Sequence, residues 1–492
     1  MLLNRLARVT AVLVALNTAA CGHSDTTQTP TPGTPAPGTP ARGAPAAGSG
    51  APGTPTSPTP PPTTPTAAAP SSVLTAAPAV MTGCPATDAP AAAAPGTVHR
   101  RAIGGNETWT VAASPHRFPD GFEIKANATV TIEPCALLIM GDGQNGWVAE
   151  GATLVAAGEA DRPIKFDSTA ATPTKGVWTA IHFATGARPA SRLAYVVIED
   201  AGQQEYDPAA IVLDAGFVLD AQHVTIRGAK RYGVALANTA RFAPTSTDLT
   251  VTDSGIAEEQ SAAVWFKSPS SVGSLPDGHY TGNATDAILV EGGAVTANAT
   301  WRNPGVPYRI LDDVDVQSET GAILTIAPGT TLAFAQGKGL SVGHSEDGAI
   351  VLDGQNEQGR ITLTSARPVP DAGDWAGLRL GERLSRAATK LSFVTFQYTG
   401  ASGGYDAGGC SETHPSAIQI AGRDLGPKID HVTFRNLDPA SYAIVRNFRA
   451  AAPTSYVAAA LGNDFTGYGG RCRETIARPE DNNCPDPVPP CN

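Results

Sequence analysis

An apolar-x-apolar triplet that returns about every 25 residues constrains the fold of this chain more than any other feature. The copies at 196–198, 224–226 and 249–251 lie 28 and 25 residues apart, and further copies stand at 394–396 and 432–434. A parallel β-solenoid has this pattern, because each coil contributes a short strand with two inward residues and the next coil stacks ~4.8 Å away. The triplets therefore predict a stack of coils.

A longer repeat runs through the same region. Five pairs of segments match in one order, with offsets of 199, 194, 197, 198 and 208 residues: 109–111 with 308–310, 131–135 with 325–329, 178–183 with 375–380, 193–198 with 391–396, and 223–227 with 431–435. Offsets that drift only by loop insertions indicate a duplicated unit of about 200 residues. A β-propeller or a β-sandwich is the alternative, but strands every 8 to 12 residues would be typical of those folds.

The segments 131–168 and 325–365 resemble a succession of motifs found in exported bacterial β-helix proteins of the pectin-lyase-like superfamily. The succession is I-x-P-G-T, G-x-L-x-x-x-G, P-I-x-F-T-S and W-x-G-I, and the resemblance spans residues 105–450. Residues 325–330 (Thr-Ile-Ala-Pro-Gly-Thr) fit the first motif, whereas the first copy has Cys135 and Ala136 in place of Gly-Thr.

From these features we predict an all-β chain, a right-handed parallel β-helix (solenoid) built from a duplicated unit of about 200 residues. The expected units are 99–300 and 301–450, followed by a disulfide-containing cap at 451–492. Glycines are expected to end strands at the corners of the coils, namely Gly202, Gly228, Gly255 and Gly400.

The N-terminus predicts export. Arg5 and Arg8 precede an apolar stretch at 9–16 and small residues at 18–20, the order of a secretory signal peptide, and Cys21 follows directly. This ending resembles the lipobox of bacterial lipoproteins, which implies that Cys21 is acylated. Thr18 departs from that motif, which usually has Leu there, and the alternative is cleavage nearby with a free Cys21.

Residues 22–98 are expected to form a disordered tether, since the stretch from about 26 to 69 is almost entirely Pro, Thr, Gly, Ala and Ser. Such a stretch lacks the apolar side chains that would offset the entropy of ordering. We expect a cell-envelope protein that meets the membrane through its N-terminal lipid. Whether it faces the periplasm or the cell surface stays open.

Six cysteines remain beside Cys21: Cys84, Cys135, Cys410, Cys472, Cys484 and Cys491. An even number fits disulfides in an oxidising compartment. Cys84 and Cys135 are the two in the N-terminal part and are expected to join each other. The spacing has no C-x-x-C element, so we predict no zinc site, no other metal and no cofactor.

The net charge of −11 argues against a nucleic-acid partner, which calls for a basic surface. The central residues of the triplets point outward, and they are Val197, Thr225, Thr250, Thr395 and Thr433. They include no acid, base or metal ligand, so we predict no catalytic residue.

Polar residues elsewhere offer weaker candidates. His182 and Arg379 point outward at equivalent places, and His182 is a conceivable general base, although an outward histidine without a placed carboxylate is usually solvated. His223 and His431 precede equivalent triplets. The runs at 312–313, 142–146 and 353–356 are interpreted as turns or corners rather than as catalytic or calcium sites.

An insertion at 400–415 lengthens one coil of the second unit only. It holds the best polar cluster in the sequence, a possible ligand-binding loop made of Tyr405, Asp406, Glu412 and His414. Long loops on a rigid scaffold often carry binding residues.

We therefore hypothesise a non-enzymatic cell-envelope β-helix lipoprotein that binds a polysaccharide or another surface component, such as a protein. The alternative is a carbohydrate-active enzyme, a polysaccharide lyase or glycoside hydrolase of the pectin-lyase-like fold. The sequence specifies neither the ligand nor the oligomeric state.

Overall fold

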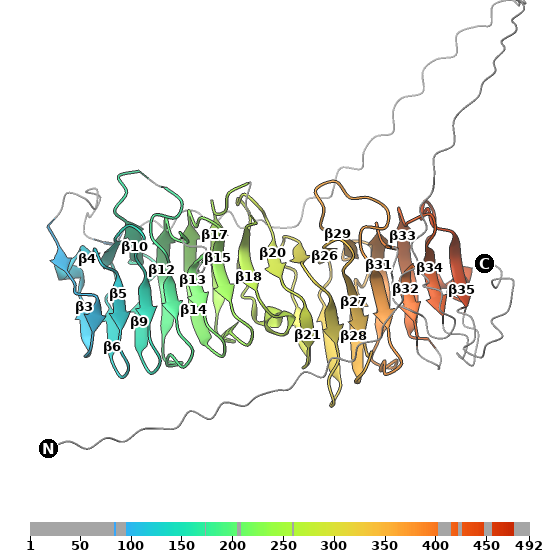
Figure 1. Ribbon diagram of the computed structural model, residues 1–492, viewed down its shortest axis with the longest axis horizontal. Helices are drawn as coiled ribbons and strands as arrows, with labels where there is room; N and C mark the ends of the chain where they lie inside the picture. The colour runs from blue at the N-terminus through green and yellow to red at the C-terminus, as the bar shows by residue number, and fades with distance from the viewer. Residues whose placement is uncertain are drawn as a thin grey trace, which may run out of the picture. The chain divides into compact units, whose positions relative to one another are not determined.

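The structure is a computed structural model in which the described residues are 83–84, 95–172, 174–203, 208–257, 260–401, 415–421, 426–446 and 455–476. They belong to one compact unit at 69–492. Its strands form curled parallel sheets of 12, 16 and 7 strands among the described residues (Figure 1). The parallel β-helix predicted from the sequence is confirmed.

Most coils run through three short strands, one on each face of the β-helix. In the first repeat, the first face consists of β1 (Thr97–Val98), β4 (His116–Phe118), β7 (Leu137–Met140), β10 (Ile164–Ser168), β12 (Arg192–Glu199), β14 (Val218–Arg227), β17 (Thr247–Thr252) and β19 (Gly278–His279). The second face consists of β2 (Ala102–Ile103), β5 (Phe122–Ile124), β8 (Gly146–Val148), β11 (Ile181–Phe183), β13 (Ala209–Leu213), β15 (Tyr232–Leu236) and β18 (Ala262–Phe266). The third face consists of β3 (Glu107–Trp109), β6 (Thr129–Ile132), β9 (Thr153–Ala157), the first halves of β12 and β14, and β16 (Arg241–Phe242).

The second repeat uses the same three classes of strand. Its equivalents of the first-face strands are β20 (Ile288–Val290), β23 (Tyr308–Ile310), β26 (Thr331–Phe334), β29 (Ile361–Ser365), β31 (Lys390–Gln397) and β33 (Lys428–Arg435). Its equivalents of the second face are β21 (Gly293–Val295), β24 (Val314–Val316), β27 (Gly339–Val342), β30 (Gly377–Leu380), β32 (Ser416–Ile420), β34 (Tyr442–Arg446) and β35 (Cys472–Ile476), and those of the third are β22 (Ala299–Trp301), β25 (Ala322–Ile326) and β28 (Gly348–Asp353).

Helix is confined to three short 3-10 segments among the described residues: η1 (Val111–Ala113), η2 (Pro269–Ser274) and η3 (Ala459–Leu461). No helix in the described part of the chain is long and apolar enough to cross a membrane.

The core is a ladder of inward side chains, as the triplets predicted. Val196, Val224 and Leu249 pair on successive coils, and so do Ile198, Ile226 and Val251. All six are buried. Glu199 and Arg227 directly follow the triplets on adjacent coils. They are neighbours, since Arg227 Nη1 lies 3.4 Å from Glu199 Oε1.

Corners between faces use residues in the left-handed backbone region. Tyr195 and His223 have φ of 48° and 53° where the third face passes into the first, and Phe393 and His431 have 52° and 51° at the equivalent corner of the second repeat. The predicted corner glycines have positive φ as well: Gly202, Gly228, Gly255 and Gly400. Residues other than glycine tolerate this region only where the surrounding structure fixes it, so the corners repeat in register with the coils.

Four of the five sequence matches align equivalent strands. Trp178 and Trp375, for example, both donate Nε1–H to a main-chain carbonyl, that of residue 199 at 2.7 Å and that of residue 397 at 2.9 Å.

The first match is wrong. Trp109 corresponds to Trp301 and not to Tyr308, because Trp109 pairs with Ile132 and Trp301 pairs with Ile326 in the same register. Tyr308 starts the equivalent of the His116 strand, on another face. Aromatic and apolar residues recur on both faces, so the short segment fits either face when the strand pairing is unknown.

The two repeats join with a shift of one face. β20 is the equivalent of β1, and its sequence position places the start of the second repeat before residue 300. It pairs with β18, a second-face strand of the first repeat. On the third face, η2 occupies the place of a strand and contacts β16, β21 and β22. The sheet on that face is interrupted there.

We predict that the inward and outward residues of one strand differ sharply in their contribution to stability. Ile226→Ala should lower the free energy of unfolding by about 2–5 kcal/mol, because paired coils cannot close around the cavity. Thr225→Ala on the outer face should cost less than about 1 kcal/mol. Urea unfolding followed by circular dichroism measures both; equal losses would contradict the assignment of inward and outward sides.

Candidate functional site

The outer side of the second face carries an unbroken row of mostly apolar residues. Consecutive coils pair Trp147 with His182, His182 with Val212, Val212 with Ala235, Ala235 with Trp265, and Trp265 with Leu289. Neighbours of this row along the strands, such as Ile181 and Phe183, lie in the core. Because side chains alternate along a strand, the row itself points outward.

From Val212 to Leu289 this row belongs to a second hydrophobic cluster, separate from the main core. The cluster consists of Ala180, Ala209, Val212, Tyr232, Ala235, Ala262 and Leu289, with Trp265 and Leu311 packed against it. We call this cluster, together with Trp147 and His182 at the start of the row, the outer apolar face. Trp147 and Trp265 are partly exposed, whereas the small residues between them are nearly buried. The two indoles lie four coils apart, or ~19 Å at ~4.8 Å per coil.

His182 lies within this row and is held by a carboxylate on the next coil. Its Nε2 lies 3.0 Å from Asp214 Oδ1, and its ring centre lies 4.1 Å from that of Trp147. Only 7% of the side chain is exposed. The hydrogen bond from His182 lowers the pKa of Asp214, so the carboxylate stays ionised.

The expectation that His182 would be solvated is therefore corrected. Pairing between coils brings a residue 32 positions later beside it, which the sequence alone does not reveal. Trp147 and Asp214 hold the imidazole in one position, so this part of the outer apolar face is rigid.

Charged groups border the outer apolar face. Lys267 Nζ lies 4.5 Å from the ring centre of Trp265, and the guanidinium carbon of Arg231 lies 5.8 Å from that of Tyr232. Glu291 follows Leu289 by two residues, and burial raises the pKa of its carboxyl group. A surface with two partly exposed indole rings, nearly buried apolar residues between them and a polar rim suits a ligand that has both apolar and hydroxylated surfaces.

The outer side of the first face has a different character. Lys165 Nζ lies 2.7 Å from Asp167 and 2.8 Å from Glu199. Burial lowers the pKa of Lys165, but the hydrogen bonds to both carboxylates outweigh it and raise the pKa overall. Lys165 thus engages both acids, and it pairs with Val197 at the start of the row of Val197, Thr225 and Thr250.

The histidines at the corners are stacking partners. His223 lies 4.4 Å from the Tyr195 ring and His431 lies 4.4 Å from the Phe393 ring, both nearly parallel. His223 Nδ1 is also 2.8 Å from Asp248 Oδ2. Their equivalent positions come from the repeated left-handed corner.

The runs interpreted as turns lie at the ends of strands: 142–146 leads into β8, 353–356 follows from the last residue of β28, and 312–313 lies between β23 and β24. Asp312 and Asp313 precede β24, where Lys338 Nζ lies 2.6 Å from Asp312 Oδ1. Within the ranges that the structure describes, no group of three or more His, Cys, Asp or Glu residues is arranged to hold a metal ion.

Several predicted sites fall outside the described residues: Cys21, Tyr405, Asp406, Cys410, Glu412, His414, Cys484 and Cys491. The predicted pairing of Cys84 with Cys135 is confirmed, with Cα atoms 5.4 Å apart. Cys472 is disulfide-bonded as well.

The first-face triplets do not indicate the outer apolar face, which therefore was not predicted from the sequence. The signal is present in the second-face strands, whose central residues are also apolar or aromatic, as in 146–148, 211–213, 234–236 and 264–266. A triplet that is apolar at all three positions indicates a strand with apolar side chains on both sides of the sheet.

The chain matches no family model, and no curated protein or solved structure is significantly similar to it.

We predict that the buried pair His182–Asp214 contributes more to the free energy of unfolding than the exposed pair His223–Asp248. Asp214→Ala leaves the buried imidazole of His182 without its acceptor and should cost about 1–3 kcal/mol of unfolding free energy. Asp248→Ala removes the same kind of partner from His223, where both side chains are more than a third exposed, and should cost under about 1 kcal/mol. Urea unfolding of both variants is the measurement, and a larger loss in Asp248→Ala would contradict the prediction.

Proposed function

We propose that this chain is a non-enzymatic β-helix protein of the cell envelope that binds a polysaccharide along its outer apolar face. The observation that supports this most is the second hydrophobic cluster on the outer side of the sheet, with the partly exposed Trp147 and Trp265 in one row.

The chemistry of a polysaccharide suits such a surface. A sugar ring has an apolar face of C–H groups that stacks on an indole, and hydroxyl groups at its edge that bond to charged and polar side chains. Lys267, Glu291 and Asp214 supply such groups beside the row. A polymer that follows the stack of coils meets both indoles at once, which raises its affinity over that of a single sugar.

The rigidity of the floor supports binding further. His182 is fixed between Trp147 and Asp214, so little side-chain entropy is lost when a ligand settles on it.

The alternative is a polysaccharide lyase or glycoside hydrolase. Such an enzyme needs acids free to move protons, and Asp167 and Glu199 on the first face both bind Lys165, which supports binding over catalysis. Incubation with acidic and neutral polysaccharides separates the two functions: new reducing ends or the absorbance of unsaturated sugars would favour the enzyme.

We predict that Trp147→Ala and Trp265→Ala each weaken polysaccharide binding several-fold to about tenfold, because one stacking platform is lost. Affinity electrophoresis in gels that contain each polysaccharide of an acidic and a neutral panel measures the effect. Tyr468→Ala is the control, since Tyr468 is a partly exposed aromatic residue on the C-terminal side of the helix. Unchanged migration of both tryptophan variants, or an equal loss in the control, would refute the proposed face.

The envelope location rests on the N-terminal sequence. We predict that Cys21→Ser releases the protein from the membrane fraction, because the acyl chains attached to this cysteine hold it there. Cys84→Ser is the control that removes a cysteine without removing the anchor. Fractionation of Cys21→Ser with the membrane would refute the anchor and would leave the binding face untouched.

A further inference from the structure

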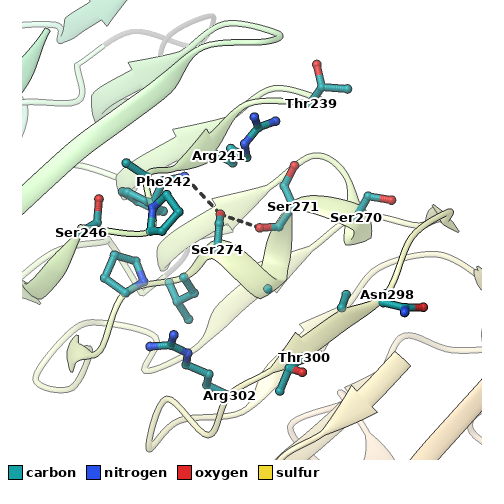
Figure 2. Close-up of a pocket in the computed structure, with 16 residues that line it drawn as sticks. Thr239, Arg241, Phe242, Ser246, Ser270, Ser271, Ser274, Asn298, Thr300 and Arg302 are labelled. Carbon is teal, nitrogen blue, oxygen red and sulfur yellow. Dashed lines mark hydrogen bonds between the residues drawn. The ribbon is translucent and has the colours of Figure 1, made fainter. Parts of the chain in front are cut away.

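A hollow of about 460 Å³ opens where the two repeats meet. Its walls come from three elements that are far apart in sequence: β16, η2 and β22 with the residues after it (Figure 2). We call it the junction hollow, and its lining includes Thr239, Arg241, Ser270, Asn298, Thr300 and Arg302.

The hollow exists because the third-face sheet is interrupted. η2 takes the place of a strand between β16 and the second repeat and contacts both. A 3-10 helix has no free edge to continue a parallel ladder, so the outer surface is indented there. An indentation by itself follows from packing, whereas the polar and charged side chains that line it also suit a ligand.

The floor of the hollow is rigid and internally bonded. Ser274 Oγ accepts the main-chain N–H of Phe242 at 3.1 Å and donates to the carbonyl of Ser271 at 2.7 Å (Figure 2). Ser270 Oγ donates to the carbonyl of Ala294 at 2.7 Å. These hydroxyl groups tie η2 to both repeats and leave the shape of the hollow fixed.

The rim of the hollow, by contrast, has hydrogen-bond donors that a ligand can use. The guanidinium of Arg241 makes no hydrogen bond or ion pair with any described residue. Asn298 uses its amide oxygen to accept the N–H of Ile323 at 2.9 Å, which leaves its NH₂ group available. Arg302 meets Asp277 at 3.1 Å in a pair whose side chains are both more than half exposed, so a ligand can compete for it.

The charge of the lining is unusual for this chain. The net charge is −11, yet two arginines and no aspartate or glutamate line the hollow among the described residues. Guanidinium groups bind carboxylate, sulfate and phosphate through paired hydrogen bonds, and the volume lies in the range of small-molecule sites.

We propose that the junction hollow is a binding site for a small hydroxylated molecule that carries one oxyanion, a carboxylate, sulfate or phosphate group. Arg241 binds the oxyanion, and Asn298, Thr300 and Arg302 contact the hydroxyl groups. The site lies on a different face from the outer apolar face and does not depend on the polysaccharide function.

Titration calorimetry of the whole exported chain tests the site. The probes are glucuronate, glucose 6-sulfate and glucose 6-phosphate, with glucose as the uncharged analogue. We expect at least one of the three anions to bind and glucose to bind at least about tenfold more weakly, because glucose lacks the group that pairs with Arg241. Which of the three binds most tightly identifies the oxyanion.

Variants separate the hollow from general charge attraction. Arg241→Gln should weaken binding of the anion about tenfold or more, whereas Arg192→Gln, an equal change of charge at an exposed residue of β12 outside the hollow, should leave it unchanged. Matching circular dichroism melting curves show that both variants are folded. Binding of no anion, equal binding of glucose, or equal losses in the two variants would overturn the proposal. Retained polysaccharide binding by Arg241→Gln would show that the outer apolar face is independent of it.

Discussion

Parallel hydrogen bonding between successive coils is the constraint on which the rest of this structure depends. The pairing of β12 with β14 holds residues 192–199 in register with 220–227, and β17 continues it. Once neighbouring coils are in register, every inward residue has an inward neighbour above and below it. The core therefore consists of ladders, and the outer surface consists of rows that extend over several coils.

The corners follow from the same constraint. A chain that must change direction at the same point on each coil needs the same backbone conformation there, and the left-handed residues Tyr195 and His223 supply it. Because these residues occupy the same place on adjacent coils, their rings stack with centres 4.4 Å apart. Phe393 and His431 repeat the arrangement in the second unit. The recurrence of histidine at this place has a structural cause and needs no catalytic one.

The joint between the repeats explains why two surfaces differ. Because β20 pairs with β18, the row of outward residues on the second face continues from Trp265 to Leu289 and on to Arg309 in the second repeat. The outer apolar face thus crosses the joint. The third face cannot continue in the same way, since η2 stands where a strand would pair, and the junction hollow opens there. The shift by one face at the joint therefore extends the outer apolar face and indents the third face.

The sequence by itself determined the class of fold, the direction of the triplet side chains and most of the duplication. Those features depend on patterns local to one coil: two apolar residues around an outward one, and a spacing that sets the length of a turn. It also indicated the Cys84–Cys135 pair, because these are the two cysteines in the N-terminal part of the chain.

Only the tertiary structure decided which residues share a surface. His182 contacts Asp214 and Trp147 on neighbouring coils, and Arg241 and Thr300 line one hollow at a joint in which the second repeat is displaced by one face. Such neighbours depend on loop lengths and on the pairing of whole strands, and a one-residue shift of the pairing exchanges the inward and outward sides of a strand. The local pattern gives the strand, and the stack of coils gives the site.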